Sequence, residues 1–272
     1  MEWTLVSELL LLFGVGLVTG TTTVLFGFGG GFVTVPVIVA VDAGLGDDAA
    51  HVAVATSSVV MVVNALVATA ATDRGVLGLL RGRSLLVGLL ALGGAAGAVA
   101  ALVAPSAVIT WGFVAYVTGT IVDLLARPGF LRPAGGGEPE PRRATLATGA
   151  GLPIGVVSSF LGVGGSVLTV PLLRRAGHPM RVATTLANPL TLAIAAPALV
   201  VFLAQRSAIT ADGGILLVGA VDLGAAAALL VGALPVIVVL RRRPPRIPDG
   251  IYAWTYVGLL ALVAVSMVVT TV

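Results

Sequence analysis

The chain has 272 residues, of which 58% are hydrophobic and only 10% are charged, and its mean hydropathy is +1.11. So few charged side chains cannot cover the surface of a soluble domain, which excludes that class of protein. The absence of cysteine excludes disulfides, thiol catalysis and thiolate metal sites. The basic residues are all arginines in short loops, a pattern typical of membrane orientation, so no nucleic-acid partner is expected. Because lysine is absent, a Gly-x-x-x-x-Gly-Lys nucleotide loop is excluded as well.

Apolar segments long enough to cross a bilayer follow one another along the chain. A transmembrane helix needs about 20 apolar residues, and solid runs of Ala, Leu, Val and Gly lack the alternation of a membrane barrel. We therefore predict an all-α polytopic membrane protein in the lipid bilayer. Its apolar segments lie at about 5–41, 49–71, 84–104, 106–126, 144–174, 182–204, 213–240 and 250–271. Composition divides the chain into a first membrane repeat (1–126), a cytoplasmic linker rich in Pro, Gly and charge (127–143) and a second membrane repeat (144–272).

Two copies of a glycine-rich motif lie in corresponding places of the two repeats. GFGGGFVTVPVI covers residues 27–38 and GVGGSVLTVPLL covers residues 162–173, and six of their twelve positions are identical. A Val-Ala-Thr sequence follows each copy, and a Leu-Leu-Val-Gly sequence comes later in each repeat, at 85–88 and at 216–219. Three matches in the same order indicate an internal duplication.

The loop arginines indicate how the two repeats cross the membrane. If each glycine-broken segment crosses once, the loop arginines divide 8 to 7 between the two sides; if each is a hairpin, they divide 14 to 1, with Arg206 alone. Because cytoplasmic loops collect positive charge, we predict hairpins, inverted repeats, the cell membrane as location and both termini outside. The limb after the glycines has about ten residues, or about 15 Å of helix. The hairpin therefore either turns near the midplane or bends before the glycines, and both remain open.

The broken helices also predict where a ligand binds. Non-helical backbone at membrane depth is buried in protein or lines a polar cavity, and paired broken helices form the midplane site of secondary transporters. A helix N-terminus offers free N–H groups and partial positive charge to an anion, and glycine lets the anion approach. The predicted cradle precedes helices beginning near Phe32 and Val167 and consists of Gly29, Gly30, Gly31, Gly164, Gly165 and Ser166. The alternative is close helix packing through small residues.

Polar residues beside the motif are expected to complete the hydrogen bonds of the anion. Alternatively, the hydroxyls among them bond their own helix backbone. Asn64 is a weaker candidate, because Leu192 takes its place in the second repeat. The predicted substrate-binding set is Thr56, Ser57, Thr184, Thr185 and Asn188, with Ser58 next to it.

Asp222 is a separate candidate, because no other charge lies near it in its apolar run. An ionisable group in a membrane segment indicates function, and proton coupling is one such function. Ala91 takes its place in the first repeat, so Asp222 is not part of the symmetric site, and its long segment also allows a place near the interface. Asp123 is predicted to form an i,i+4 ion pair with Arg127.

The two half-repeats, each with a Gly-x-Gly-Gly cluster, a proline six or seven residues later and a Val-Ala-Thr helix, resemble the TauE/SafE family of sulfite and organosulfonate exporters. The resemblance extends over nearly the whole chain. It implies a secondary transporter of a small sulfur-containing anion of the sulfite, organosulfonate or thiosulfate class, acting as an exporter. Ser166, where the first copy has a third glycine, is a departure that adds a hydroxyl donor.

We expect access to alternate as one repeat rocks against the other around the midplane site. A passive small-anion channel is the runner-up. A membrane-embedded hydrolase would need a nucleophile with a base, and only Ser166 and His178 are available, without an acid partner. We therefore predict no enzyme activity, no catalytic residue, no cofactor and no metal site, and leave homo-oligomerisation open.

Overall fold

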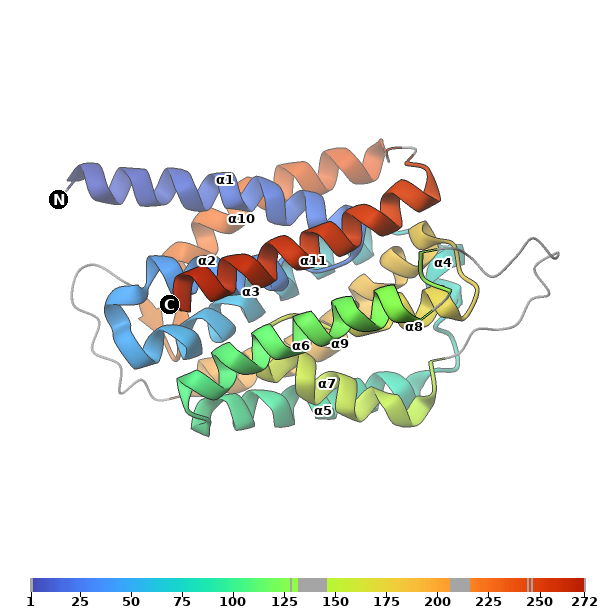
Figure 1. The fold of residues 1–272 in the computed structure, drawn as a ribbon, viewed down its shortest axis with the longest axis horizontal. Helices are drawn as coiled ribbons and strands as arrows, with labels where there is room; N and C mark the ends of the chain where they lie inside the picture. The colour runs from blue at the N-terminus through green and yellow to red at the C-terminus, as the bar shows by residue number, and fades with distance from the viewer. Residues whose placement is uncertain are drawn as a thin grey trace.

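The computed structural model describes residues 2–127, 129–131, 146–205, 216–243, 245 and 247–271, with side chains from residue 7 onward. Helices dominate this part of the chain (Figure 1), which confirms the predicted all-α membrane protein. The predicted linker lies almost entirely outside the described residues. Seven described helices are long and apolar enough to cross a membrane: α1 (Glu2–Phe26), α3 (Ala49–Ala70), α5 (Ser84–Val103), α6 (Ser106–Ala126), α9 (Met180–Ala204), α10 (Leu223–Arg242) and α11 (Asp249–Thr271).

Shorter elements complete the described part of the fold. They are the helices α2 (Gly31–Val41), α4 (Arg74–Gly78), α7 (Gly151–Phe160) and α8 (Ser166–Arg175), the 3-10 turns η1 (Ala43–Asp48) and η2 (Thr148–Ala150), and the antiparallel strands β1 (Leu217–Val218) and β2 (Val221–Asp222). The glycines of each motif interrupt a helical segment: residues 27–30 separate α1 from α2, and residues 161–165 separate α7 from α8. The bend therefore lies at the glycines, not before them.

The two broken segments return to opposite ends of the bundle. In Figure 1, α1 runs from the left into the interior and α2 returns to the left, whereas α7 enters from the right and α8 returns to the right. The returning limbs are short: α2 has 11 residues and α8 has 10, about half of what a full crossing needs.

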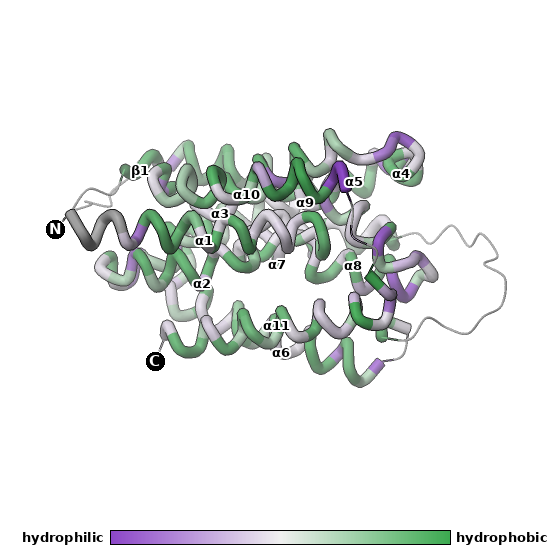
Figure 2. The backbone as a smooth tube through the Cα atoms, turned by 90° about the horizontal axis from the view of Figure 1, so that it is seen from above, coloured by the Kyte–Doolittle hydropathy of each residue, from purple (hydrophilic) through white to green (hydrophobic). Residues whose placement is uncertain are grey.

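Charge divides the two ends of the bundle. We call the end on the right of Figure 1 the arginine end; α3, α6, α8 and α10 finish there, and α5, α9 and α11 begin there. Its side chains include Arg83, Arg127, Arg175, Arg181 and Arg241. Figure 2 shows hydrophilic residues concentrated there, around α4 and α8. The opposite end carries the start of α1, the finish of α11, and Asp42. Five of the fifteen arginines lie outside the described residues: Arg132, Arg142, Arg143, Arg206 and Arg246.

Small residues let α1 approach α10 and let α7 approach α5. A Cβ on Gly16 or Gly232 would strike a backbone carbonyl across the α1–α10 contact, and a Cβ on Gly93 or Gly155 would do so across the α5–α7 contact. No side chain fits at these positions, so the backbones pack directly, as is common in membrane helices. Other extensive helix contacts in the described structure are α5 with α9, α3 with α9, α2 with α3, α3 with α10, α6 with α11, and α8 with α9.

The repeated Leu-Leu-Val-Gly sequence adopts two different structures. Residues 85–88 open α5, whereas residues 216–219 lead into the turn between β1 and β2, and α10 begins only at Leu223. Gly219 has φ 62, and its Cβ would strike the carbonyl of Phe202, so the chain turns there against the end of α9. The apolar segment predicted at 213–240 therefore extends further towards the N-terminus than the helix does.

Candidate functional site

The two glycine turns, residues 27–31 and 162–166, meet in the interior of the bundle, and we call their contact the glycine crossing. A Cβ on Gly31 would lie 2.7 Å from the carbonyl oxygen of Gly162. A Cβ on Gly164 would lie 3.2 Å from the carbonyl oxygen of Phe28. The structure thus brings the two copies of the motif into direct backbone contact.

Backbone conformation accounts for several of the glycines. Gly29, Gly30 and Gly164 have φ values of 65, 95 and 72, in the left-handed region that side chains disfavour. Gly165 differs, because its φ is −72 and an added Cβ would meet only the side-chain tip of Ile194, at 2.6 Å. The left-handed turns therefore require Gly29, Gly30 and Gly164, whereas Gly165 is not required for backbone conformation. The predicted role of these residues as an anion cradle stays a prediction.

Two helix N-termini lie at the crossing. Gly30 is the N-cap of α2 and Gly165 is the N-cap of α8, and in the described structure neither helix receives a side-chain cap. The first N–H groups of a helix have no partner within the helix. Both positive helix ends are therefore available at the place where the turns meet.

Asn64 lies beside the first turn, although its lack of a repeat counterpart made it a weak candidate. Its side chain is fully buried on α3, and neither Nδ2 nor Oδ1 has a hydrogen-bond partner among the described residues. The Nδ2 atom is 2.8 Å from the Cβ position of Gly30. A buried amide without partners is costly, which makes Asn64 the strongest ligand candidate at the crossing.

Further buried polar atoms surround the crossing on the α8 and α9 side. Thr191, which was not among the residues predicted for the site, packs its methyl group against the Cβ positions of Gly29 (2.9 Å) and Gly164 (3.2 Å). The Oγ atoms of Ser166 and Thr191 and the Oδ1 atom of Asn188 have no partner within the described part of the chain. Thr191 follows Asn188 by three residues on one helix, a spacing that puts both on one face.

The other predicted polar residues divide between three places. Ser57 reaches the second turn, where its hydroxyl donates to the carbonyl of Gly162 at 3.2 Å and of Val54 at 2.7 Å. The Thr56 hydroxyl accepts a hydrogen bond from the backbone N–H of Asp222 at 2.9 Å, so it stabilises the start of α10. Thr184 and Thr185 both donate to the carbonyl of Arg181 and lie towards the arginine end.

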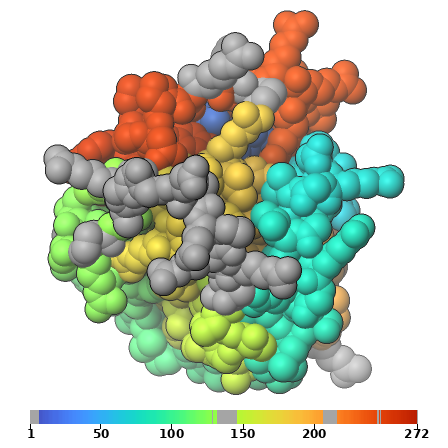
Figure 3. All heavy atoms as spheres, turned by 90° about the vertical axis from the view of Figure 1, so that its right-hand side faces the viewer, coloured from blue at the N-terminus to red at the C-terminus, as the bar shows by residue number. Residues whose placement is uncertain are grey.

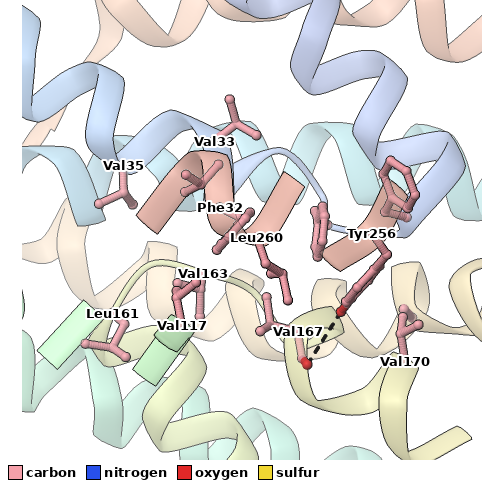
Figure 4. Close-up of a cluster of buried hydrophobic side chains, with 14 of the residues drawn as sticks. Phe32, Val33, Val35, Val117, Leu161, Val163, Val167, Val170, Tyr256 and Leu260 are labelled. Carbon is pink, nitrogen blue, oxygen red and sulfur yellow. Dashed lines mark hydrogen bonds between the residues drawn. The ribbon is translucent and has the colours of Figure 1, made fainter. Parts of the chain in front are cut away.

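An apolar layer covers the crossing on the side of α11. Phe28 and Phe32 of the first hairpin pack near Tyr256 of α11 with tilted rings, whose centroids are 4.9 Å apart for the Phe pair and 5.0 Å apart for Phe28 and Tyr256. The Tyr256 hydroxyl donates to the carbonyls of Ser166 (3.2 Å) and Val167 (3.5 Å), the second of which is drawn in Figure 4. This layer shields the helix ends from bulk water, which strengthens electrostatic interactions with them.

A cavity of about 450 Å³ opens at the arginine end, and we call it the arginine vestibule. In Figure 3 it is the hollow between the ends of α9 and α10 and the segment before α4, with the end of α1 visible at its bottom. Its lining includes Leu25, Arg181, Thr184, Thr185, Arg241 and Tyr252. Two residues predicted for the site, Thr184 and Thr185, therefore lie in this vestibule together with two arginines that were predicted to lie in loops.

Acidic residues gather at the opposite end. Asp222 is the N-cap of α10, where its Oδ1 accepts from the N–H of Ala225 at 3.0 Å. Asp222 is 5% exposed and directly precedes the first residue of α10. It therefore lies at an end of this membrane helix and not in its middle. Asp42, after α2, is 3% exposed, and its Oδ2 has no partner among the described residues. Burial, and then the charges of Asp222 and Glu8, raise the pKa of Asp42 to about 7.

A sequence model of one protein family, the sulfite exporter TauE/SafE family, matches residues 12–267. The chain belongs to the TauE/SafE family. This membership, together with the apolar helices, makes it a multi-pass membrane transporter and confirms the resemblance noted from its motifs. No curated protein and no solved structure matches the chain.

In this TauE/SafE transporter, Ser166 and His178 do not form a catalytic pair. Ser166 begins α8 and His178 lies beyond its end, so a helix of 10 residues separates them, about 15 Å at 1.5 Å per residue. The carbonyl of His178 accepts a bond from Arg174 Nη1 at 3.5 Å, within the structure of the arginine end. The predicted pair of Asp123 and Arg127 is present at 3.0 Å, and Arg175 joins it at 2.6 Å.

Proposed function

We propose that this chain exports a small sulfur-containing oxyanion, such as sulfite, an organosulfonate or thiosulfate, and binds it at the glycine crossing. The observation that carries the proposal is the fully buried amide of Asn64, which lacks a partner within the described residues and lies beside Gly30. An oxyanion there would accept hydrogen bonds from this amide and from the first N–H groups of α2 and α8. Membership of the sulfite exporter family supports sulfur chemistry.

We infer that the two halves are inverted repeats that rock around the crossing. The pairing of helices supports this, because α1 packs on α10 as α7 packs on α5, and the two hairpins return to opposite ends. In such transporters the midplane site opens first to one side and then to the other. The arginine end would face the cytoplasm of the cell and both termini the outside, because cytoplasmic loops collect positive charge.

Proton coupling is proposed to involve Asp222 together with Asp42. Both carboxyl groups are buried, and burial, followed by the charges of Asp222 and Glu8, raises the pKa of Asp42 to about 7, so this carboxyl can exchange a proton near neutral pH. Asp47 and Asp48 in η1 are exposed, and His51 on α3 is bonded to the carbonyl of Ala104 at 2.9 Å. A proton taken up at this end and released at the other would give export a driving force.

Flux through proteoliposomes tests the function. We expect saturable flux of sulfite, thiosulfate or methanesulfonate, with sulfate as the comparison anion, and faster flux with a pH gradient than without. The Asn64→Leu variant should lose this flux, whereas Ser84→Ala, at an exposed position, should retain it. The proposed substrate class is wrong if no sulfur anion moves or binds. Flux that rises linearly with concentration and ignores the pH gradient would favour the passive channel.

A further inference from the structure

The arginine vestibule contains a guanidinium group without an acceptor. The Nε and Nη2 atoms of Arg241 are both buried, and neither has a hydrogen-bond partner in the described part of the chain. These two atoms form one edge of the guanidinium fork, which is the edge that holds two oxygens of a single oxyanion side by side. A buried guanidinium edge is costly when nothing accepts from it, so this arrangement suits a ligand.

The carboxylates around the vestibule are occupied elsewhere. Asp249 pairs with Arg174 and accepts a bond from the N–H of Met180 at 3.2 Å. Asp73 accepts a bond from the N–H of Gly75 at 2.6 Å and so begins α4. No ion pair among the described residues includes Arg241 or Arg181.

A second arginine adds to the positive charge. Arg181 also lines the vestibule, and it is close enough to Arg241 for the two charges to repel. An anion between them would remove this repulsion. The hydroxyl groups on the same wall already donate within the protein, those of Thr184 and Thr185 to the carbonyl of Arg181 and that of Tyr252 to the carbonyl of Leu25. The two guanidinium groups therefore supply the donors for an anion.

The vestibule also adjoins the glycine crossing. Thr184 lines the cavity, and its backbone carbonyl is in contact with the position where a Cβ on Gly27 would lie. Leu25, at the bottom of the cavity, is two residues before that glycine. The lining of the vestibule therefore reaches the start of the first glycine turn.

We propose that the arginine vestibule is a second binding site for a small oxyanion, held by the Nε and Nη2 atoms of Arg241 and assisted by Arg181. Its role as a loading site for transport rests on the proposed function, but the binding itself does not. The ligand class is a carboxylate, sulfonate or sulfite group with two adjacent oxygens. The site attracts anions from solution at the arginine end before they reach the crossing.

Labelling of a single cysteine tests the binding directly, because the chain has no cysteine of its own. Val182→Cys places a thiol in the lining of the vestibule, and Ser84→Cys places one at an exposed position of the same end. Methanesulfonate and sulfoacetate are suitable probes, since sulfite would react with a maleimide reagent. We expect either probe to slow the labelling of Val182→Cys in a saturable way and to leave Ser84→Cys unaffected.

Three arginine variants show whether this protection of the Val182→Cys thiol depends on Arg241. In the Val182→Cys background, Arg241→Gln should weaken protection by about tenfold or more, the loss expected for a charged bidentate contact. Arg241→Lys keeps the charge without the fork and should fall between wild type and Arg241→Gln. Arg243→Gln removes one positive charge at an exposed neighbouring position, and the probes should still protect the introduced thiol from labelling as they do without this change. Since Arg241 has no partner in the described structure, its loss should not lower the melting temperature.

The outcomes separate this site from the transport function. Equal protection in Arg241→Gln and wild type, an equal loss in Arg243→Gln, or no protection of wild type by either probe would each overturn the vestibule site. Protection that depends on Arg241, in a protein that carries no sulfur anion, would support the vestibule and contradict the proposed function. With transport present, Arg241→Gln should raise the half-saturating concentration at the arginine end and leave that at the opposite end unchanged.

Discussion

The two glycine turns have matching sequences, but their backbones differ at the fourth position of the motif. Gly30 and Gly165 occupy the same position of the motif, yet Gly30 has φ 95 and Gly165 has φ −72. The next position differs too, because a Cβ on Gly31 would lie 2.7 Å from the carbonyl of Gly162, whereas Ser166 is accommodated in the second turn. At this position the first turn therefore requires glycine for its conformation and the second does not, although Gly29 and Gly164, one residue earlier, both have a left-handed φ.

The side chains around the two turns differ as well. Asn64 lies against the first turn, and the residue at its place in the second repeat is Leu192. Thr191 and Asn188 supply polar atoms from α9 instead. Both repeats thus place a helix N-terminus at the crossing, but the polar side chains around the two N-termini differ. The two sides of one anion could therefore be bound by different groups.

The largest expected effect distinguishes the two backbones. In Gly30→Ala, the left-handed φ costs about 1–2 kcal/mol, and the added methyl group would lie 2.8 Å from Asn64 Nδ2. In Gly165→Ala, φ is favourable, and Ile194 needs only to move the tip of its side chain. We expect Gly30→Ala to lower the melting temperature and abolish anion binding, and Gly165→Ala to do neither.

Leucine is too large for either turn, so Gly30→Leu and Gly165→Leu should both lose binding. Calorimetric titration with methanesulfonate and thermal melting of the same preparations measure both effects. Alanine variants with equal losses would mean that space alone, and not conformation, governs the two turns.

The next effect concerns the polar groups. Asn64→Leu gives the first repeat the residue of the second, and it removes an amide that has no partner in the described structure. Loss of a hydrogen bond to a charged ligand should weaken anion affinity by about 10- to 100-fold, while the melting temperature stays level or rises. Ser58→Ala is the control, because the Ser58 hydroxyl bonds its own helix at the carbonyl of Ala55 (2.6 Å). Unchanged affinity in Asn64→Leu would remove this residue from the site.

A third effect distinguishes the residues that end the two short helices, Asp42 after α2 and Ala176 after α8. Burial and the nearby Asp222 and Glu8 raise the pKa of Asp42 from 3.8 to about 7. A raised folded-state pKa favours the protonated form, so its contribution to stability is full below about pH 4 and is lost as the pH rises through about 7. We expect the melting temperature of wild type to be lower at about pH 8 than at about pH 5 for this reason.

Asp42→Asn should flatten this pH dependence, whereas Asp48→Asn, at an exposed acid of the same end, should leave it as in wild type. Asp222→Asn keeps a good N-cap residue, so it should change stability by only a few tenths of a kcal/mol while it weakens the response of transport to a pH gradient. A transport response equal to that of wild type would make Asp222 a purely structural cap.

The smallest effect is expected at Ser166. Ser166→Gly makes the second turn match the first and removes one hydroxyl donor, so the ratio of sulfite to methanesulfonate affinity should change by a few-fold, about 1 kcal/mol or less. The reverse change, Gly31→Ser, should be far worse tolerated because of the nearby Gly162 carbonyl. Competition binding measures the ratio, and an identical ratio in Ser166→Gly would mean that the hydroxyl has no part in selectivity.

Much of the fold follows from local sequence. The helices, the breaks at Gly29 and Gly164, and short limbs starting within a residue of Phe32 and Val167 were all predictable from apolar length and glycine content. The start of α10 was not, because residues 216–219 look like a helix start, and only the contact of Gly219 with the end of α9 turns the chain there. The inverted orientation of the repeats, inferred from arginine counts, remains a prediction.

The sequence alone determined the membrane class, the helical architecture, the duplicated turns and the family, because hydropathy, glycine content and motifs are properties of neighbouring residues. Only the tertiary structure decided which polar groups meet. In it, Thr56 bonds to the start of α10, Asn64 and Thr191 lie at the crossing, and Arg241 has no acceptor within the described residues. These contacts join residues from different helices, and helix packing, which no local pattern encodes, sets their distances.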